Sequence, residues 1–192
     1  MNLLKKQRDA FGLSLFDKEL KIHSLCKSST SHYKQLLSFL GKMISNPEHD
    51  KTTSAAEALH QIADRIHKRS MVIIFSDMFE QSENSEKLFS ALQHLKYNKH
   101  EVILFHVVDK EHELDFNYPN RPYLFIDMET GEKVKLQSNQ VKELYVKKVS
   151  EFTRELKLKC LQYRIDFIEA DINKGYKQVL TAYLVKRKKM RI

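Results

Sequence analysis

Residues 71–75 of this chain read MVIIF, and residues 102–108 read VILFHVV. Neither run shows the polar alternation of a half-exposed strand, and such continuous apolar runs are typical of central strands covered on both faces of a sheet. Between them, residues 85–97 have the apolar spacing of an amphipathic helix. A strand, a helix and a second strand in this order predict two parallel strands joined by a crossover.

The pattern continues in both directions from this unit. Further helices are expected at residues 31–44, 53–68, 138–162 and 174–185, and a last short strand at residues 165–168. Two hairpins are also expected, one from residues 10–16 with 20–26 and one that turns at Gly131. These elements predict an α/β fold with a doubly wound, mostly parallel sheet, in which the first hairpin supplies an antiparallel strand at one edge.

Length and composition favour one globular domain. The chain has 192 residues, of which 42% are hydrophobic, so it can bury a core. Its four glycines are scattered, at positions 12, 41, 131 and 175. This spacing excludes the dinucleotide-binding fingerprint and the phosphate-binding loop, because both require clustered glycines close to phosphate.

The net charge of +8 comes largely from a basic tail at residues 186–192, KRKKMRI, which contains five cations and no acid. A frayed helix end whose cations complement the helix dipole explains this tail without any ligand. Nucleic-acid binding is the alternative, although it normally requires cations distributed along a groove with interleaved aromatic residues.

The expected location is the cytoplasm. Cys26 and Cys160 form no C-x-x-C motif, which favours a reducing compartment, and both thiols are expected to be packed as small hydrophobic groups. The N-terminus has no apolar segment typical of a signal peptide. No apolar run approaches the roughly 20 residues that span a bilayer, so no membrane contact is expected.

Carboxylates follow three predicted strands, at Asp17, Asp77 and Asp109. If these strands are parallel, the three side chains lie at one edge of the sheet, where open α/β sheets bind ligands. Together with the hydroxyls of Ser76 and Thr53 they would suit a hard cation such as Mg²⁺. The alternative is structural, because Asp is common in turns and caps after strands.

Other chemistry has little support in the sequence. His60 and His67 can share a helix face but have no third ligand near them in sequence, and His106 is expected to be a buried, hydrogen-bonded imidazole. Cys160 lies within a predicted helix among apolar residues, which is typical of an inert thiol. No G-x-S-x-G elbow or spaced Ser/His/Asp set is present.

At these residues the chain resembles a known family. The resemblance rests on residues 12–17, 53–79, 100–116 and 124–132, which read GLSLFD, TSAAEALHQIADRIHKRSMVIIFSDMF, HEVILFHVVDKEHELDF and LFIDMETGE. The order of these segments is similar to that of bacterial von Willebrand factor A-like proteins associated with MoxR-type AAA+ ATPases, known as domain of unknown function fifty-eight. The resemblance implies a Rossmann-type sheet with a metal-ion-dependent adhesion site at the carboxyl ends of its strands.

That site has three pieces in the family. An Asp-x-Ser-x-Ser loop follows the first strand, a Thr precedes a later helix, and an Asp follows the central strand. Thr53 matches the second piece, with Thr52 as the alternative, and Asp77 matches the third, although Met78 stands where Gly is usual.

The first piece has no match in this chain. Residues 1–9 resemble the end of the first helix, so the resemblance implies that the first strand and its loop precede Met1. The expected organisation is therefore a single, N-terminally truncated domain over residues 1–192, with the first strand missing. Thr53 and Asp77 alone are expected to hold Mg²⁺ weakly, since a bound cation needs several converging oxygens.

The leading hypothesis is a non-enzymatic module that binds a partner protein through a shared divalent cation and serves a MoxR-type ATPase in assembling or remodelling other proteins. A Mg²⁺-dependent phosphoester hydrolase that uses Asp17, Asp77 and Asp109 is the alternative. Nucleic-acid binding by the cations of the tail is the third and weakest hypothesis.

Overall fold

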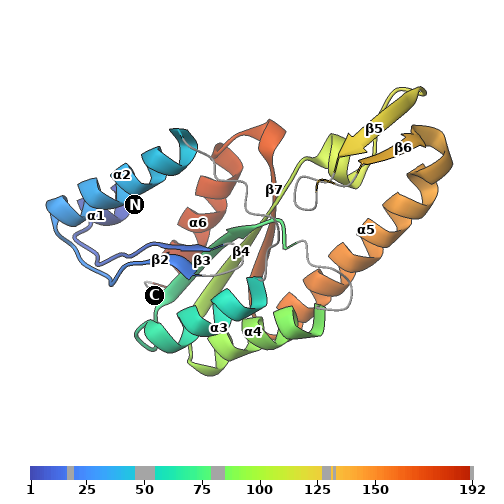
Figure 1. The fold of residues 1–192 in the computed structure, drawn as a ribbon. Helices are drawn as coiled ribbons and strands as arrows, with labels where there is room; N and C mark the ends of the chain where they lie inside the picture. The colour runs from blue at the N-terminus through green and yellow to red at the C-terminus, as the bar shows by residue number, and fades with distance from the viewer. Residues whose placement is uncertain (17–19, 46–54, 79–84, 127–130, 132, 191–192) are drawn as a thin grey trace.

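The computed structural model describes residues 1–16, 20–45, 55–78, 85–126, 131 and 133–190. Figure 1 shows an α/β arrangement in which helices flank a small central sheet. The helices are α1 (Asn2–Lys6), α2 (Thr30–Ser45), α3 (Ala55–Arg65), α4 (Ser85–Tyr97), α5 (Ser138–Gln162) and α6 (Lys177–Met190), with a π-helix at Lys110–Leu114 and a 3₁₀ turn at Ile172–Lys174. The strands are β1 (Ser14–Phe16), β2 (Leu20–His23), β3 (Met71–Ser76), β4 (Glu101–Val108), β5 (Pro122–Ile126), β6 (Lys133–Gln137) and β7 (Asp166–Asp171).

The central sheet has three parallel strands in the order β3–β4–β7. Met71 pairs with Glu101 at one end of the β3–β4 ladder, and Ser76 pairs with His106 at the other. All three strands run in one direction, so their C-terminal ends share one edge, here called the carboxyl edge. The continuous apolar runs of β3 and β4 thus form parallel strands, as the sequence predicts.

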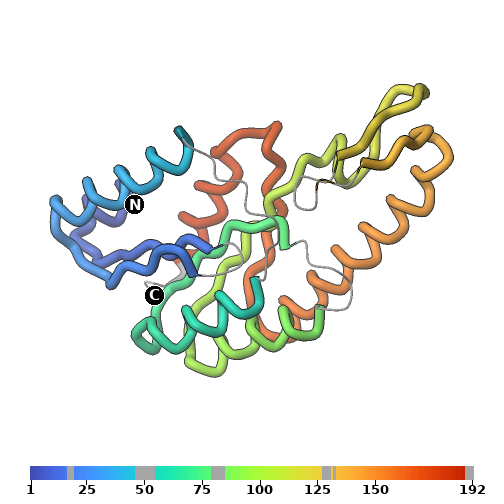
Figure 2. Tube along the Cα trace, in the orientation of Figure 1, coloured from blue at the N-terminus to red at the C-terminus, as the bar shows by residue number. Residues whose placement is uncertain are grey.

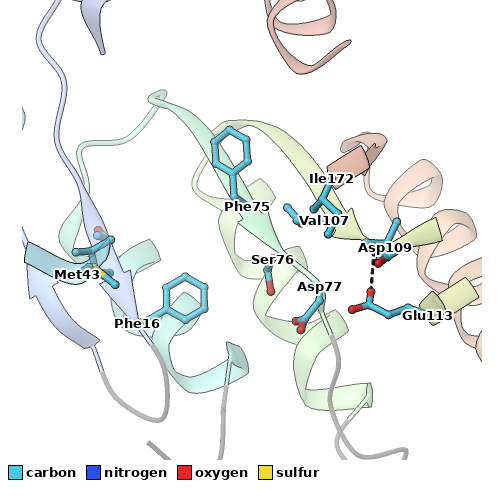
Figure 3. Close-up of a pocket in the computed structure, with 12 residues that line it drawn as sticks. Phe16, Met43, Phe75, Ser76, Asp77, Val107, Asp109, Glu113 and Ile172 are labelled. Carbon is cyan, nitrogen blue, oxygen red and sulfur yellow. Dashed lines mark hydrogen bonds between the residues drawn. The ribbon is translucent and has the colours of Figure 1, made fainter. Parts of the chain in front are cut away.

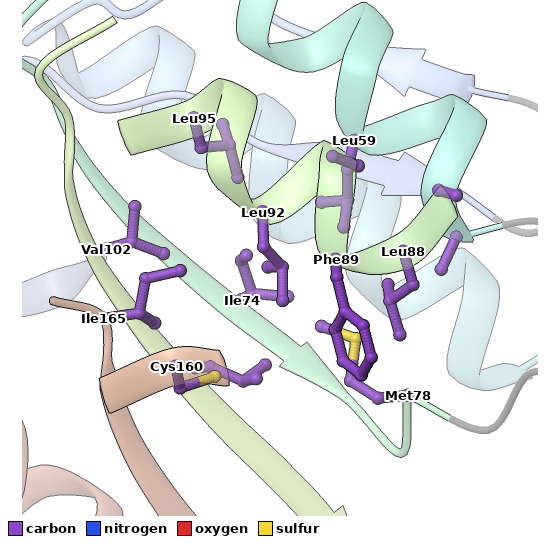
Figure 4. Close-up of a cluster of buried hydrophobic side chains, with 14 of the residues drawn as sticks. Leu59, Ile74, Met78, Leu88, Phe89, Leu92, Leu95, Val102, Cys160 and Ile165 are labelled. Atoms are coloured by element: carbon purple, nitrogen blue, oxygen red, sulfur yellow. The ribbon is translucent and has the colours of Figure 1, made fainter. Parts of the chain in front are cut away.

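Helices cover both faces of this sheet. Val102 and Leu104 of β4 belong to a core that includes residues of α3, α4 and α5, part of which Figure 4 shows. Ile103 and Phe105, on the opposite face of the same strand, pack with residues of α1 and α6. Because successive strand residues point to opposite faces, one apolar run supplies both cores. The prediction of an α/β fold with a parallel, Rossmann-like sheet is thus confirmed.

The first hairpin is not part of the central sheet, which corrects the predicted topology. β1 and β2 pair with each other in antiparallel register, with Ser14 opposite His23, and form a separate two-stranded sheet. β1 has three residues, and its register is interrupted between Leu15 and Phe16. A cleft lies between β1 and β3, so the two strands do not pair, and β3 is an edge strand of the described sheet.

The C-terminal helix extends beyond its predicted end into the basic tail. α6 runs to Met190, and Lys186 lies 2.8 Å from Asp166 and 3.4 Å from Glu101. The guanidinium of Arg187 contacts the carboxylate of Asp9. Two cations of the tail therefore attach α6 to the sheet and to the segment after α1, instead of projecting as a basic arm.

The second hairpin, β5–β6, forms an arm together with the start of α5, as the tube in Figure 2 shows. An aromatic cluster, formed by Phe116, Tyr118, Tyr123, Phe125 and Tyr145, lies at the base of this arm. The ring of Phe116 is central, with its centroid 4.7 Å from that of Tyr145 and 5.7 Å from that of Phe125. Gly131 at the tip has a φ of 73°, which Gly adopts without strain.

Among the helices of the described residues, none is both long enough and apolar enough to cross a bilayer.

Candidate functional site

Each strand of the central sheet ends at an aspartate. Asp77 follows β3, Asp109 follows β4, and Asp171 is the last residue of β7. The prediction that Asp77 and Asp109 share one edge is confirmed, whereas Asp17 lies outside the described residues. Sequence reasoning missed Asp171 because the last strand was expected to end at residue 168. The run DFIEAD at 166–171 continues the extended pattern and could have revealed it.

A cleft of about 500 Å³ opens at this carboxyl edge, between the edge of β3 and the first hairpin. Figure 3 shows Asp77, Asp109 and Glu113 at one side of it and Phe16 on the facing hairpin. Phe75 is 57% exposed and its ring stacks on that of Phe105, with the centroids 4.9 Å apart. The cleft is therefore lined by apolar side chains along the strands and by carboxylates at the strand ends; its described lining residues are Ser14, Leu15, Phe16, Met43, Phe75, Ser76, Asp77, Val107, Val108, Asp109, Glu113 and Ile172.

The backbone around Asp77 is held from both sides. The buried imidazole of His106 donates its Nε2–H to the carbonyl oxygen of Asp77, at 2.8 Å. The hydroxyl oxygen of Ser76 accepts a hydrogen bond from the amide of Met78, at 3.0 Å. The carboxylate of Asp77, in contrast, is on an exposed residue. Asp77 is thus presented to the cleft from a restrained turn.

Met78 anchors this turn in the core. Its φ of 52° lies in the left-handed region, which non-glycine residues rarely adopt. Its side chain is 1% exposed and belongs to the same core cluster as Leu88 and Phe89 of α4, as Figure 4 shows. Burial of this side chain therefore offsets a backbone conformation that costs about 1–2 kcal/mol.

His106 is a buried residue that supports the turn at Asp77. The residue is 3% exposed, and burial lowers the pKa of its imidazole, so the neutral form is favoured. Its Nδ1 atom is buried and has no hydrogen-bond partner among the described residues. The expected buried, hydrogen-bonded histidine is thus confirmed for one ring nitrogen, and the role of that nitrogen is to position Asp77.

Asp109 organises the loop after β4. Its Oδ1 accepts hydrogen bonds from the amides of Glu111 and His112 and from the side chain of Asn173, at 3.0–3.3 Å. Its Oδ2 lies 2.8 Å from Nδ1 of His112, while its own amide donates to Glu113 Oε2. The hydrogen bond with His112 lowers the pKa of Asp109, and the same bond raises the pKa of His112. Asp109 therefore caps the π-helix Lys110–Leu114.

His112 is a residue of this edge that sequence reasoning missed. The three-residue spacing from Asp109 was visible, but a π-helix at this point was not expected. The imidazole is 45% exposed next to the Tyr118 ring, so it is accessible from solvent.

The described residues contain part of the expected cation site. Ser76 and Asp77 lie in the cleft, but Thr53 and its alternative Thr52 fall outside the described residues. No group of three or more His, Cys, Asp or Glu side chains within the described ranges is arranged to hold a metal ion. The oxygens of Ser76 and Asp77 suit Mg²⁺ in kind but are too few to enclose it, so a cation here would need ligands from elsewhere.

The predictions for the cysteines and for the histidine pair are confirmed only in part. Cys160 is fully buried, and burial raises the pKa of its thiol to about 12, which confirms an inert, packed cysteine. Cys26 is exposed, contrary to the prediction, and lies in the segment after β2. His67 lies beyond the end of α3, so it does not share a helix face with His60.

The comparisons with known proteins give one match. A family model described as "Protein of unknown function DUF58" matches residues 1–155. The matched segment contains Asp77, Asp109 and the hairpin side of the cleft, and it ends within α5. Neither the curated proteins nor the solved structures give a match.

Proposed function

This chain belongs to the family of proteins of unknown function DUF58, and we propose that it is a non-enzymatic module that binds a partner protein at the carboxyl edge of its sheet. The proposal includes a von Willebrand factor A-like sheet and a partnership with a MoxR-type AAA+ ATPase in assembling or remodelling other proteins. The observation that carries it is the exposed Asp77, whose turn is held by His106 and Ser76 at the mouth of a cleft lined by apolar side chains and carboxylates.

The nature of the cleft supports binding of a macromolecule. Phe75 presents more than half of its surface to solvent beside the edge of β3. Exposed apolar surface bordered by charged groups is typical of interaction sites. Because Asp77 adds a carboxylate at one end, this surface combines an apolar contact area with a polar end.

A divalent cation would connect the two proteins. Asp77 would be a direct or water-mediated ligand, Thr53 a hydroxyl ligand, and Ser76 a supporting donor, while the cation would supply positive charge that attracts a partner carboxylate. Ligands from the partner would complete a coordination shell that the described residues provide only in part. The expected dependence on Mg²⁺ is therefore a property of the complex more than of the free chain.

A binding assay tests this proposal. The chain is immobilised and exposed to a MoxR-type ATPase with Mg²⁺ or with EDTA, and Asp77→Ala is compared with Glu151→Gln, a control at an exposed position on α5. Capture that is lost with EDTA and with Asp77→Ala, but kept by the control, supports a metal-bridged complex. Capture that is unchanged by EDTA and by Asp77→Ala would rule out the cation bridge.

The phosphoester hydrolase is the second candidate, and the observation that favours it is the presence of Asp77, Asp109 and Glu113 in one cleft. Both carboxylate oxygens of Asp109 already accept hydrogen bonds within the loop, so this residue is engaged in structure. Mg²⁺-dependent release of nitrophenol from p-nitrophenyl phosphate that Asp77→Asn abolishes would favour the hydrolase over the binding module.

A further inference from the structure

Two histidines from neighbouring helices face each other in a cluster that shares no residue with the cleft. Nδ1 of His60 on α3 lies 3.0 Å from Nδ1 of His94 on α4, and the ring centroids are 5.2 Å apart. Asp64, one turn after His60, places Oδ1 3.4 Å from Nε2 of His94. Both His94 and Asp64 are accessible, with side chains 27% and 68% exposed.

One arrangement of protons satisfies these contacts. When His94 carries its single proton on Nε2, facing Asp64, its Nδ1 atom has a lone pair. In this tautomer that lone pair accepts a hydrogen bond from the Nδ1–H of His60. If the proton of His60 moves to its Nε2 atom through solvent, both Nδ1 atoms present lone pairs to the same space, and the net charge of the pair is unchanged.

The helices that carry this pair are firmly packed. Leu59 and Ala63 of α3 and Leu92 and Leu95 of α4 are almost fully buried in one core. The side chain of Asn98, just after α4, donates a hydrogen bond to the carbonyl of Ala63 at 3.0 Å. The backbone positions of His60 and His94 are thus fixed, and only side-chain torsions need to adjust for a ligand.

We propose that His60 and His94 form a binding site for a borderline transition-metal cation such as Cu²⁺, Ni²⁺ or Zn²⁺, with both Nδ1 atoms as ligands and water in the remaining positions. Metal–nitrogen bonds of about 2.0–2.1 Å place two ligand nitrogens about 2.9 Å apart at a right angle and about 3.3 Å apart in a tetrahedron. The observed distance of 3.0 Å between the two Nδ1 atoms lies within this range.

Asp64 would not bind the metal itself but would orient His94 in this site. Histidines that bind metals usually donate their other ring N–H to a carboxylate, which fixes the tautomer and raises the basicity of the ring. The contact of Asp64 with Nε2 of His94 is of this kind. Nitrogen ligands also separate this site from the proposed Mg²⁺ site at Asp77, because Mg²⁺ prefers oxygen.

The test is a calorimetric titration of the full chain with NiCl₂, CuCl₂ or ZnCl₂ at neutral pH, with MgCl₂ as the negative control. One site is expected for the transition metals, with Cu²⁺ bound most tightly. His60→Gln and His94→Gln should each remove it or weaken it at least about tenfold, and Asp64→Asn should weaken it by about tenfold. His67→Gln and His112→Gln are matched controls at exposed histidines and should leave it unchanged.

Two further measurements distinguish a metal site from a simple hydrogen bond between the helices. Circular dichroism of each variant first establishes that it folds, and NMR shows which imidazole resonances shift with diamagnetic Zn²⁺. Selective shifts of His60 and His94 support the site. Equal affinity in the parent, His60→Gln and His94→Gln, or shifts confined to other histidines, would show that the pair is a hydrogen bond between helices and not a metal site.

Discussion

Nε2 of His106 lies 2.8 Å from the carbonyl oxygen of Asp77, so a buried side chain of β4 holds the residue that follows β3. The two residues are 29 positions apart in sequence and are brought together by the parallel register that pairs Ser76 with His106. The bond connects the interior of the sheet to the exposed carboxylate in the cleft. Changes in the core next to His106 are therefore expected to affect the cleft.

Replacing His106 tests this connection. His106→Phe leaves the Asp77 carbonyl without its donor and is expected to destabilise the fold by about 1–3 kcal/mol, the usual cost of a broken buried hydrogen bond. Urea denaturation measures the difference, with His67→Gln at an exposed position as the control. Equal stability of His106→Phe and the parent would contradict a structural role for this bond.

The same histidine predicts a pH dependence of stability. Burial holds the pKa of His106 in the folded chain below its ordinary value of 6.5, so the unfolded chain binds a proton more readily. The contribution of the neutral imidazole is complete above pH 6.5 and decreases as the pH falls from there toward the lowered pKa. Denaturation midpoints between pH 7.5 and pH 5 should decrease in the parent, and less so in His106→Phe. A parallel decrease in both proteins would assign the effect to other groups, such as His100, whose pKa burial also lowers.

Met78 provides a prediction about backbone strain. Both Met78→Ala and Met78→Gly lose a buried side chain, which costs about 2–5 kcal/mol for the truncation to Ala. The φ of 52° reverses the usual order of the two variants, because Gly adopts the left-handed region without the cost of about 1 kcal/mol that Ala retains. Met78→Gly should therefore be the more stable variant in urea, and the opposite order would show that this turn rearranges when Met78 is lost.

Addition of metal to the free chain tests the partial cation site. Thermal melting is measured with EDTA or with millimolar Mg²⁺ in the parent and in Asp77→Ala. A ligand at a hundred times its dissociation constant would add about 2.7 kcal/mol. Because the described residues of the cleft supply few ligands, the expected shift is smaller, and it should be absent in Asp77→Ala. A full-sized shift that persists in Asp77→Ala would place the cation elsewhere.

Lys186 offers a test of how α6 is attached. Lys186→Met removes a cation that contacts Glu101 and Asp166, and it is expected to cost about 0.5–1 kcal/mol because the groups are partly exposed. Lys188→Met, at an exposed position of the same helix, is the matched control and should have a smaller effect. The difference should shrink at high salt, since salt screens the attraction.

The sequence predicted those elements whose signals are local. The sequence predicts α4 at about residues 85–97 and α5 at about residues 138–162, and the observed bounds agree, because an amphipathic helix repeats its pattern every few positions. β3 and β4 were recognised from continuous apolar runs, and their shared direction placed Asp77 and Asp109 at one edge. The π-helix after Asp109 was missed, since its cap depends on hydrogen bonds and not on periodicity.

Relationships between distant segments were harder to predict. A cleft separates the first hairpin from the sheet, and this separation depends on contacts between distant segments, which no local pattern describes. The sequence places His67 on the same predicted helix as His60, whereas the observed partner of His60 is His94, 34 positions away. The parts of the candidate sites that could be predicted are thus the residues at strand ends, and the parts that could not are contacts between elements.

The aromatic cluster at the base of the β5–β6 arm makes the tyrosine signals of the molecule sensitive to the state of this arm. The chain contains eight tyrosines and no tryptophan, and three of these tyrosines, Tyr118, Tyr123 and Tyr145, lie in this cluster. Tyrosine fluorescence and near-ultraviolet dichroism therefore depend strongly on the arm, whereas far-ultraviolet dichroism reports on all helices and strands. If the arm detaches before the sheet unfolds, the two signals will change at different denaturant concentrations, so a single optical probe would misjudge the order of unfolding.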